Sequence, residues 1–121
     1  MILFDTNMIL RYLLNDQEEM ADRAEQLLNG GQVFVTIEVI AEVVYVLKGV
    51  YKLDKKKIVQ TAKGFLELVN CREMDVLVFA LDAYETHGLD FIDCVLYSYH
   101  AVRGLEIATF DKKLKKLLTQ A

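Results

Sequence analysis

The sequence predicts an α/β domain in which a central parallel sheet of about four to five short strands carries helices on both faces. Short apolar runs alternate along the chain with longer segments of helical periodicity. These runs are apolar throughout instead of alternating in polarity, which is typical of parallel strands covered on both faces. With 121 residues, the chain is expected to form one domain, residues 1–121.

The individual elements follow from apolar runs and from residues that start or stop helices. Strands are expected over residues 2–4, 32–35, 72–74 and 106–110. Helix N-caps, whose side-chain oxygens accept bonds from first-turn N–H groups, are expected at Asn7, Thr36, Asp54 and Asp111. The predicted helices span residues 8–14, 17–28, 37–50, 55–70, 76–86, 91–103 and 112–118.

Composition indicates an ordinary globular protein, with 54% hydrophobic and 26% charged residues. The formal net charge of −4 gives the molecule no overall attraction to a phosphate backbone, so any nucleic-acid contact must come from local basic patches. The two cysteines have no zinc-ligand spacing and are expected to be reduced thiols in the cytoplasm. Asp5, Asn7 and Arg11 interrupt the first apolar run, so we expect no membrane segment.

Two aspartates follow predicted strands directly, in MILFDTN and in EIATFDKKL. In parallel sheets, ligands bind outside the carboxyl ends of the strands, where Asp5 and Asp111 are expected to lie. Either residue could equally be a helix N-cap, an arrangement worth about 1 kcal/mol. Position alone leaves both interpretations open.

Two further acids lie on predicted helices. Glu42 shares a stripe with Glu38 and Tyr45, which is compatible with a cleft or with solvent. In LDFIDCVLYSYHAVRG, the aspartates form part of a stripe on an otherwise apolar helix. Asp90 is expected to be the N-cap of that helix, and Asp93 the acid that points away from it.

A cluster of these acids would require a cation. Two carboxylates about 4 Å apart repel by about 4 kcal/mol at an effective dielectric constant of about 20. Oxygen ligands without a convergent histidine or cysteine favour Mg²⁺ or Mn²⁺. Phosphoryl transfer is the chemistry that uses such sites, because the metal activates water and neutralises the in-line transition state.

Four stretches resemble PIN-domain ribonucleases, and more closely the small VapC-type toxins of toxin–antitoxin pairs. They are ILFDTNMILRYLL, TIEVIAEVVYVL, LDFIDCVLYSYHAVRG and IATFDKKLKKL, in this order between residues 2 and 118. The resemblance implies a PIN-like fold with Asp5, Glu42, Asp93 and Asp111 as its catalytic acids. It implies that Asp5 and Asp93 bind metal directly, and that Glu42 and Asp111 complete the shell directly or through water.

The same resemblance implies an activity and partners. The activity would be metal-dependent endonucleolytic cleavage of single-stranded RNA, and the partners a cognate small antitoxin and a second copy of the chain in a homodimer. The accessory hydrogen-bonding residues would be Thr6, Asn7 and Thr109.

Cations near the predicted site are candidates for RNA contact. Lys112 and Lys113 adjoin Asp111 and could hold an RNA backbone at the rim of the pocket, or could be solvated surface. Arg11 follows Asp-Thr-Asn on the same helix and is another candidate phosphate contact.

Three other protein classes share parts of this pattern. A receiver domain of phosphorelay signalling has a similar length, a parallel sheet and a Mg²⁺ site, but it requires adjacent acids after the first strand and an Asp after a central strand. A phosphatase of the haloacid-dehalogenase type requires Asp-x-Asp where this chain has Asn7 in second place. A non-catalytic PIN-fold interaction module would be expected to lack an acid, and all four are present.

Overall fold

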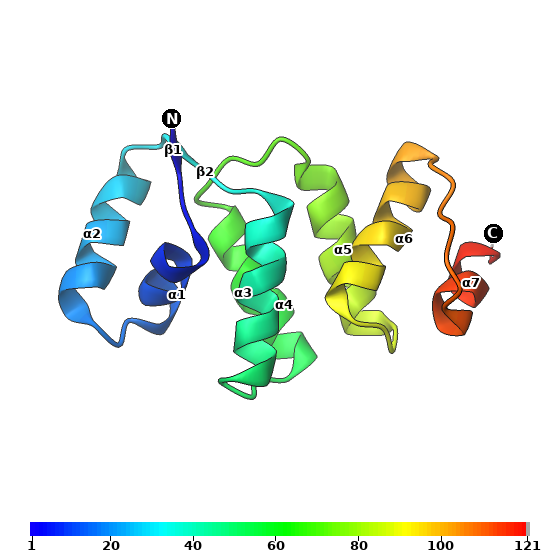
Figure 1. The fold of residues 1–121 in the computed structure, drawn as a ribbon. Coiled ribbons are helices and arrows are strands. Elements are labelled where there is room, and N and C mark those ends of the chain that lie inside the picture. The colour runs from blue at the N-terminus through cyan, green and yellow to red at the C-terminus, as the bar shows by residue number, and fades with distance from the viewer. Residues whose placement is uncertain (121) are drawn as a thin grey trace. The chain divides into compact units, whose positions relative to one another are not determined.

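The computed structural model describes residues 1–120 (Figure 1). These residues form two compact units. Unit 1 spans Met1–Glu73, and unit 2 begins at Met74. Among the described residues, unit 1 contains both strands and four helices, and unit 2 contains three helices. No helix in residues 1–120 is long and apolar enough to cross a membrane.

Unit 1 contains a parallel pair of strands, β1 (Ile2–Leu3) and β2 (Val33–Phe34). Ile2 lies opposite Val33, and Leu3 lies opposite Phe34. The strands predicted at 2–4 and 32–35 are therefore confirmed, with shorter bounds. Phe34 also forms an isolated parallel bridge with Asn70, whose backbone oxygen accepts a bond from the N–H of Val35 at 2.9 Å.

The third predicted strand, residues 72–74, is wrong in position. The extended pairing occurs at Asn70, where both the backbone and the side-chain amide donate to the carbonyl of Val33, at 2.9 and 3.1 Å. Residues 72 and 73 form a turn, and a helix begins at Met74.

Four helices complete unit 1: α1 (Thr6–Leu14), α2 (Glu18–Asn29), α3 (Ile37–Gly49) and α4 (Lys55–Leu66). α1 packs against α2 and α3, and α3 packs against α4. The residues at the centre of this unit are aliphatic and almost completely buried: Ile9, Val33, Ile40, Val43, Leu47 and Ile58.

Of the three N-cap residues predicted in unit 1, Thr36 and Asp54 are confirmed and Asn7 is wrong. The side chains of Thr36 and Asp54 accept bonds from Val39 N and Lys57 N, at 3.3 and 2.8 Å. Asn7 is not the cap of α1, because the helix already begins at Thr6 and the N-cap is Asp5. β1 ends early enough for Asp5 to take the extended backbone conformation that an N-cap requires.

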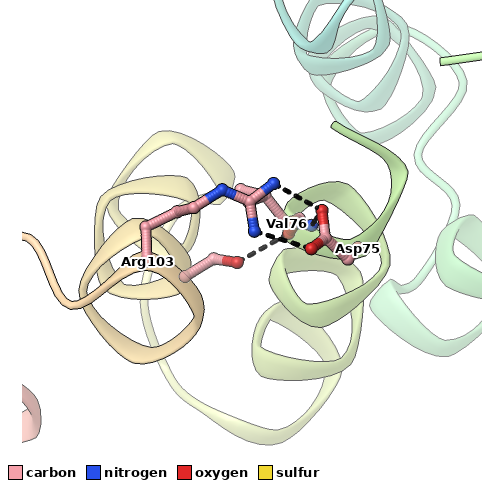
Figure 2. Close-up of polar contacts among 4 residues, drawn as sticks. Asp75, Val76 and Arg103 are labelled. Carbon is pink, nitrogen blue, oxygen red and sulfur yellow. Dashed lines mark hydrogen bonds and ion pairs between the residues drawn. The ribbon is translucent and has the colours of Figure 1, made fainter. Parts of the chain in front are cut away.

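Unit 2 contains α5 (Met74–Thr86), α6 (Phe91–Arg103) and α7 (Lys112–Leu118). α5 and α6 pack along their apolar faces, and α7 contacts α6. Figure 2 shows two polar links between α5 and α6. Arg103 binds both carboxylate oxygens of Asp75, at 2.6 and 2.8 Å, and the buried hydroxyl of Ser98 donates to the carbonyl of Val76 at 2.6 Å.

The last predicted strand, residues 106–110, is absent from the structure. A strand exists only when its backbone pairs with another strand, and no strand occurs elsewhere in the described part of unit 2. The segment is anchored locally instead, with Gly104 in the left-handed region at φ 71° and His100 Nδ1 within 2.8 Å of the carbonyl of Leu105. The α/β class with parallel strands is confirmed, but the described sheet has two strands and not the expected four to five.

Both cysteines are free thiols, as predicted. Cys94 is buried in α6, and Cys71 is half-buried. Burial raises the pKa of the Cys71 thiol, so this side chain is less reactive than an exposed cysteine.

Candidate functional site

Four of the predicted site residues line one open pocket in unit 1, of about 510 Å³. We call it the acidic pocket; its lining residues are Asp5, Thr6, Asn7, Leu10, Val39 and Glu42. Two separate segments of the sequence, residues 5–10 and 39–42, therefore contribute to one surface. The fold explains this, because the parallel strands β1 and β2 lead into α1 and α3, and these two helices pack together.

Asp5 has a structural role and still leaves a carboxylate oxygen for a ligand. Its Oδ1 accepts a hydrogen bond from Met8 N at 2.9 Å, which caps α1. No other described residue donates a hydrogen bond to this carboxylate. Glu42 is exposed on the solvent side of α3, opposite the buried Ile40 and Val43. The capping and ligand interpretations of Asp5 are thus compatible.

The other two predicted acids lie in unit 2, with Asp90 as a third member. We call Asp90, Asp93 and Asp111 the acid cluster. Asp90 caps α6 by accepting from the N–H of Asp93 at 2.9 Å, and Asp111 caps α7 by accepting from the N–H of Leu114 at 2.8 Å. The N–H of Asp111 in turn donates to the hydroxyl of Thr109 at 3.0 Å. The accessory residue Thr109 therefore fixes the backbone that carries Asp111.

The acid cluster makes ionisation of Asp93 unfavourable. Desolvation raises the pKa of Asp93, and the negative charges of Asp90 and Asp111 raise it further. Sequence reasoning identified Asp90 only as a helix cap and missed its electrostatic effect. The spacing signal was present, because an N-cap Asp and an acid three residues later lie on the same first turn of the helix.

The residues fit a hard divalent cation by the chemistry of their donors. The acidic pocket offers carboxylate, hydroxyl and amide oxygens, and none of its described lining residues is a histidine or cysteine. In the acid cluster, a cation would relieve the repulsion that raises the pKa of Asp93. Within either unit, however, the described residues include no group of three or more His, Cys, Asp or Glu side chains placed to hold a metal ion. Of the four predicted ligands, Asp5 and Glu42 lie in unit 1, and Asp93 and Asp111 lie in unit 2.

The candidate RNA contacts have different surroundings. Arg11 is mostly buried, with 12% of its side chain exposed, and its Nη1 lies 3.0 Å from Asp16. Lys112 is exposed at the start of α7, and Lys113 lines a pocket next to the α5–α6 connection. These contacts and the metal-ligand roles of the acids remain predictions.

Comparison with known proteins adds a family relationship. The family model described as PIN domain matches residues 2–118. A protein named VapC ribonuclease, from Aquifex aeolicus (strain VF5), is 30% identical over 125 residues, which cover 97% of this chain and 92% of that protein. No solved structure gives a significant match.

Proposed function

Because the chain belongs to the PIN-domain family and is of the VapC type, we propose that it is a metal-dependent endoribonuclease and the toxin of a toxin–antitoxin pair. Supporting this proposal, the relative from Aquifex aeolicus is named a ribonuclease and is similar to almost the whole chain. The observation that carries the proposal in this chain is the acidic pocket, where Asp5 and Glu42 lie together with Thr6 and Asn7.

The proposed reaction is hydrolysis of an RNA phosphodiester by water. Asp5, Glu42, Asp93 and Asp111 are the proposed metal ligands and catalytic acids. Mg²⁺ or Mn²⁺, when bound, would supply an activated water and neutralise charge in the in-line transition state. The chain's contribution is to orient these carboxylates: Asp5 and Asp111 are held by the helices they cap, and Thr109 holds the backbone of Asp111.

The partners are proposals on the same basis. The RNA substrate and a small antitoxin follow from the VapC-type relationship, and the homodimer follows from the family resemblance. Co-expression with a small protein encoded beside the toxin gene should give a purified complex in which RNA cleavage is inhibited.

Cleavage of a mixed pool of structured RNAs tests the proposed activity directly. We expect cutting in Mn²⁺ or Mg²⁺, no cutting in EDTA, and a loss in the Asp5→Asn variant greater than the roughly 10- to 100-fold cost of removing an outer-shell partner of a metal. Asp54→Asn is the matched control, because Asp54 caps α4 through the same bond that Asp5 makes to α1. Asparagine is itself a good N-cap, so both variants should fold.

The outcomes separate catalysis from capping. Equal losses in Asp5→Asn and Asp54→Asn would mean that a structural effect, and not the removal of a ligand, lowers activity. A folded wild type that binds metal but cuts no RNA in the pool would favour the non-catalytic interaction module.

A further inference from the structure

Besides the acidic pocket of unit 1, the structure has a pocket in unit 2 that is lined by basic side chains. It has a volume of about 320 Å³ and lies between the α5–α6 connection and α7. We call it the basic pocket. Its polar lining side chains are those of Lys113, Lys116, His87 and Gln120, and none of its described lining residues is acidic. A surface with two ammonium groups and no carboxylate is suited to an anion.

The geometry of α7 explains why only two of its four lysines line this pocket. Leu114 and Leu117 are buried and fix which side of the helix faces the unit. Lys113 and Lys116 are three residues apart, so they project on the same side of the helix. Lys115 lies elsewhere, with its Nζ 5.8 Å from the centre of the Phe110 ring. Neither Lys113 nor Lys116 forms an ion pair with a described residue.

Two residues that line the basic pocket are close in sequence to members of the acid cluster. The lining residue Leu89 directly precedes Asp90, and Lys113 follows Asp111 by two positions. A phosphodiester approaching these acids meets like charge, in a protein whose net charge is already −4. Cations next to the acids would compensate by binding a neighbouring phosphate of the same strand.

We propose that the basic pocket binds a backbone phosphate of the RNA substrate next to the phosphate that is cleaved. This inference rests on the proposed nuclease function, and it adds a substrate-binding site with Lys113 and Lys116 as its phosphate ligands. Because phosphate contacts position a strand without reading its bases, the pocket should contribute affinity and register but not sequence preference.

The test measures binding of a fluorescent single-stranded RNA by anisotropy in EDTA, at several KCl concentrations, so that binding is observed without cleavage. Each phosphate contact contributes about 0.7 to the slope of log K against log salt on a single strand. Lys113→Ala/Lys116→Ala removes this one phosphate contact, so it should bind RNA more weakly and lose about 0.7 from that slope. The matched control is Lys56→Ala/Lys57→Ala, which removes the same charge from the exposed first turn of α4, outside the pocket.

A second variant adds charge instead of removing it. A Cβ built at Gly88 has no heavy atom within 4 Å, so Gly88→Glu should place a carboxylate at the pocket without disturbing the packing of unit 2. Gly64→Glu, at an equally open position on α4, is its control. We expect weaker RNA binding in the Gly88 variant and unchanged binding in the Gly64 variant.

The proposal is wrong if both lysine pairs lower the slope equally, or if no variant changes RNA binding. A cleavage assay in Mn²⁺ on the same proteins separates the two proposals. RNA binding that depends on the pocket, without cleavage by the wild type, would support the pocket and refute the nuclease. Normal cleavage and binding by both pocket variants would refute the pocket alone.

Discussion

At the scale of single residues, Asp93 is a carboxyl group whose ionised form is disfavoured by its surroundings. Because its pKa is raised in the folded state, Asp93 costs no stability at a pH below its unfolded pKa, where it is protonated in both states. As the pH rises through the folded pKa, the folded state must hold an unfavourable negative charge, and stability is lost. The proposed catalytic acid is thus a source of instability in the metal-free protein.

Replacing this residue should therefore stabilise the metal-free protein. We expect Asp93→Asn to melt at a higher temperature than the wild type in EDTA at pH 7, with a difference that shrinks as the pH falls towards about 4. Thermal unfolding across this pH range measures the effect, and Asp22→Asn, on the exposed side of α2, is the control. An Asp93→Asn protein that melts below the wild type at pH 7 would contradict the electrostatic explanation.

Metal addition should reverse the order of stability between these two proteins. A cation that binds only the folded state stabilises it by about 1.4 kcal/mol at ten times its Kd. Mg²⁺ or Mn²⁺ should therefore raise the Tm of the wild type, and raise that of Asp93→Asn much less. Equal shifts in both proteins would mean that Asp93 is not a ligand.

At the scale of elements, the Asp75–Arg103 ion pair joins the first turn of α5 to the last residue of α6 (Figure 2). The hydrogen bonds from Arg103 lower the pKa of Asp75 to about 2. A lowered pKa means that the ionised form is favoured by folding, so the contribution is complete above the usual value of 3.8 and disappears as the pH falls through about 2. Because both groups are exposed, salt should weaken the pair.

The expected result is a stability difference confined to one pH range. Asp75→Asn should be less stable than the wild type in urea unfolding at pH 5–7, and this difference should decrease between about pH 4 and pH 2. Glu85→Gln, on the same helix, should show no such trend. A difference that stays constant across the range would mean that the ionised Asp75–Arg103 pair contributes nothing to stability.

At the scale of the whole molecule, features that depend on nearby residues were predicted more completely than those that depend on distant ones. Every predicted helix is present, because capping residues and apolar periodicity act within a few positions of each other. α4 ends at Leu66, and the predicted end near Asn70 is too late. The prediction ran too far because no glycine or proline marks the end of the helix and Val69 continues the apolar spacing. Residues 106–110 have the composition of a strand, but composition supplies no pairing partner.

The residues of the acidic pocket were predicted from the sequence, and the basic pocket was not. The resemblance identified Asp5 and Glu42, and the structure brings them together in the acidic pocket. The basic pocket was missed, because it joins Lys113 and Lys116 to the α5–α6 connection through the packing of α7, which periodicity alone does not reveal. Lys112 and Lys113 seemed equivalent in the sequence, and only the structure separates them.

Asp5, Asp90 and Asp111 each hold a helix N-terminus through one carboxylate oxygen. A side chain held in this way has already lost much of its rotamer entropy during folding. A ligand that binds the remaining oxygen therefore meets a carboxylate restricted to nearly one orientation, and the entropic cost of association falls. The disorder that a cation would otherwise have to remove on binding is removed earlier, when these helices form.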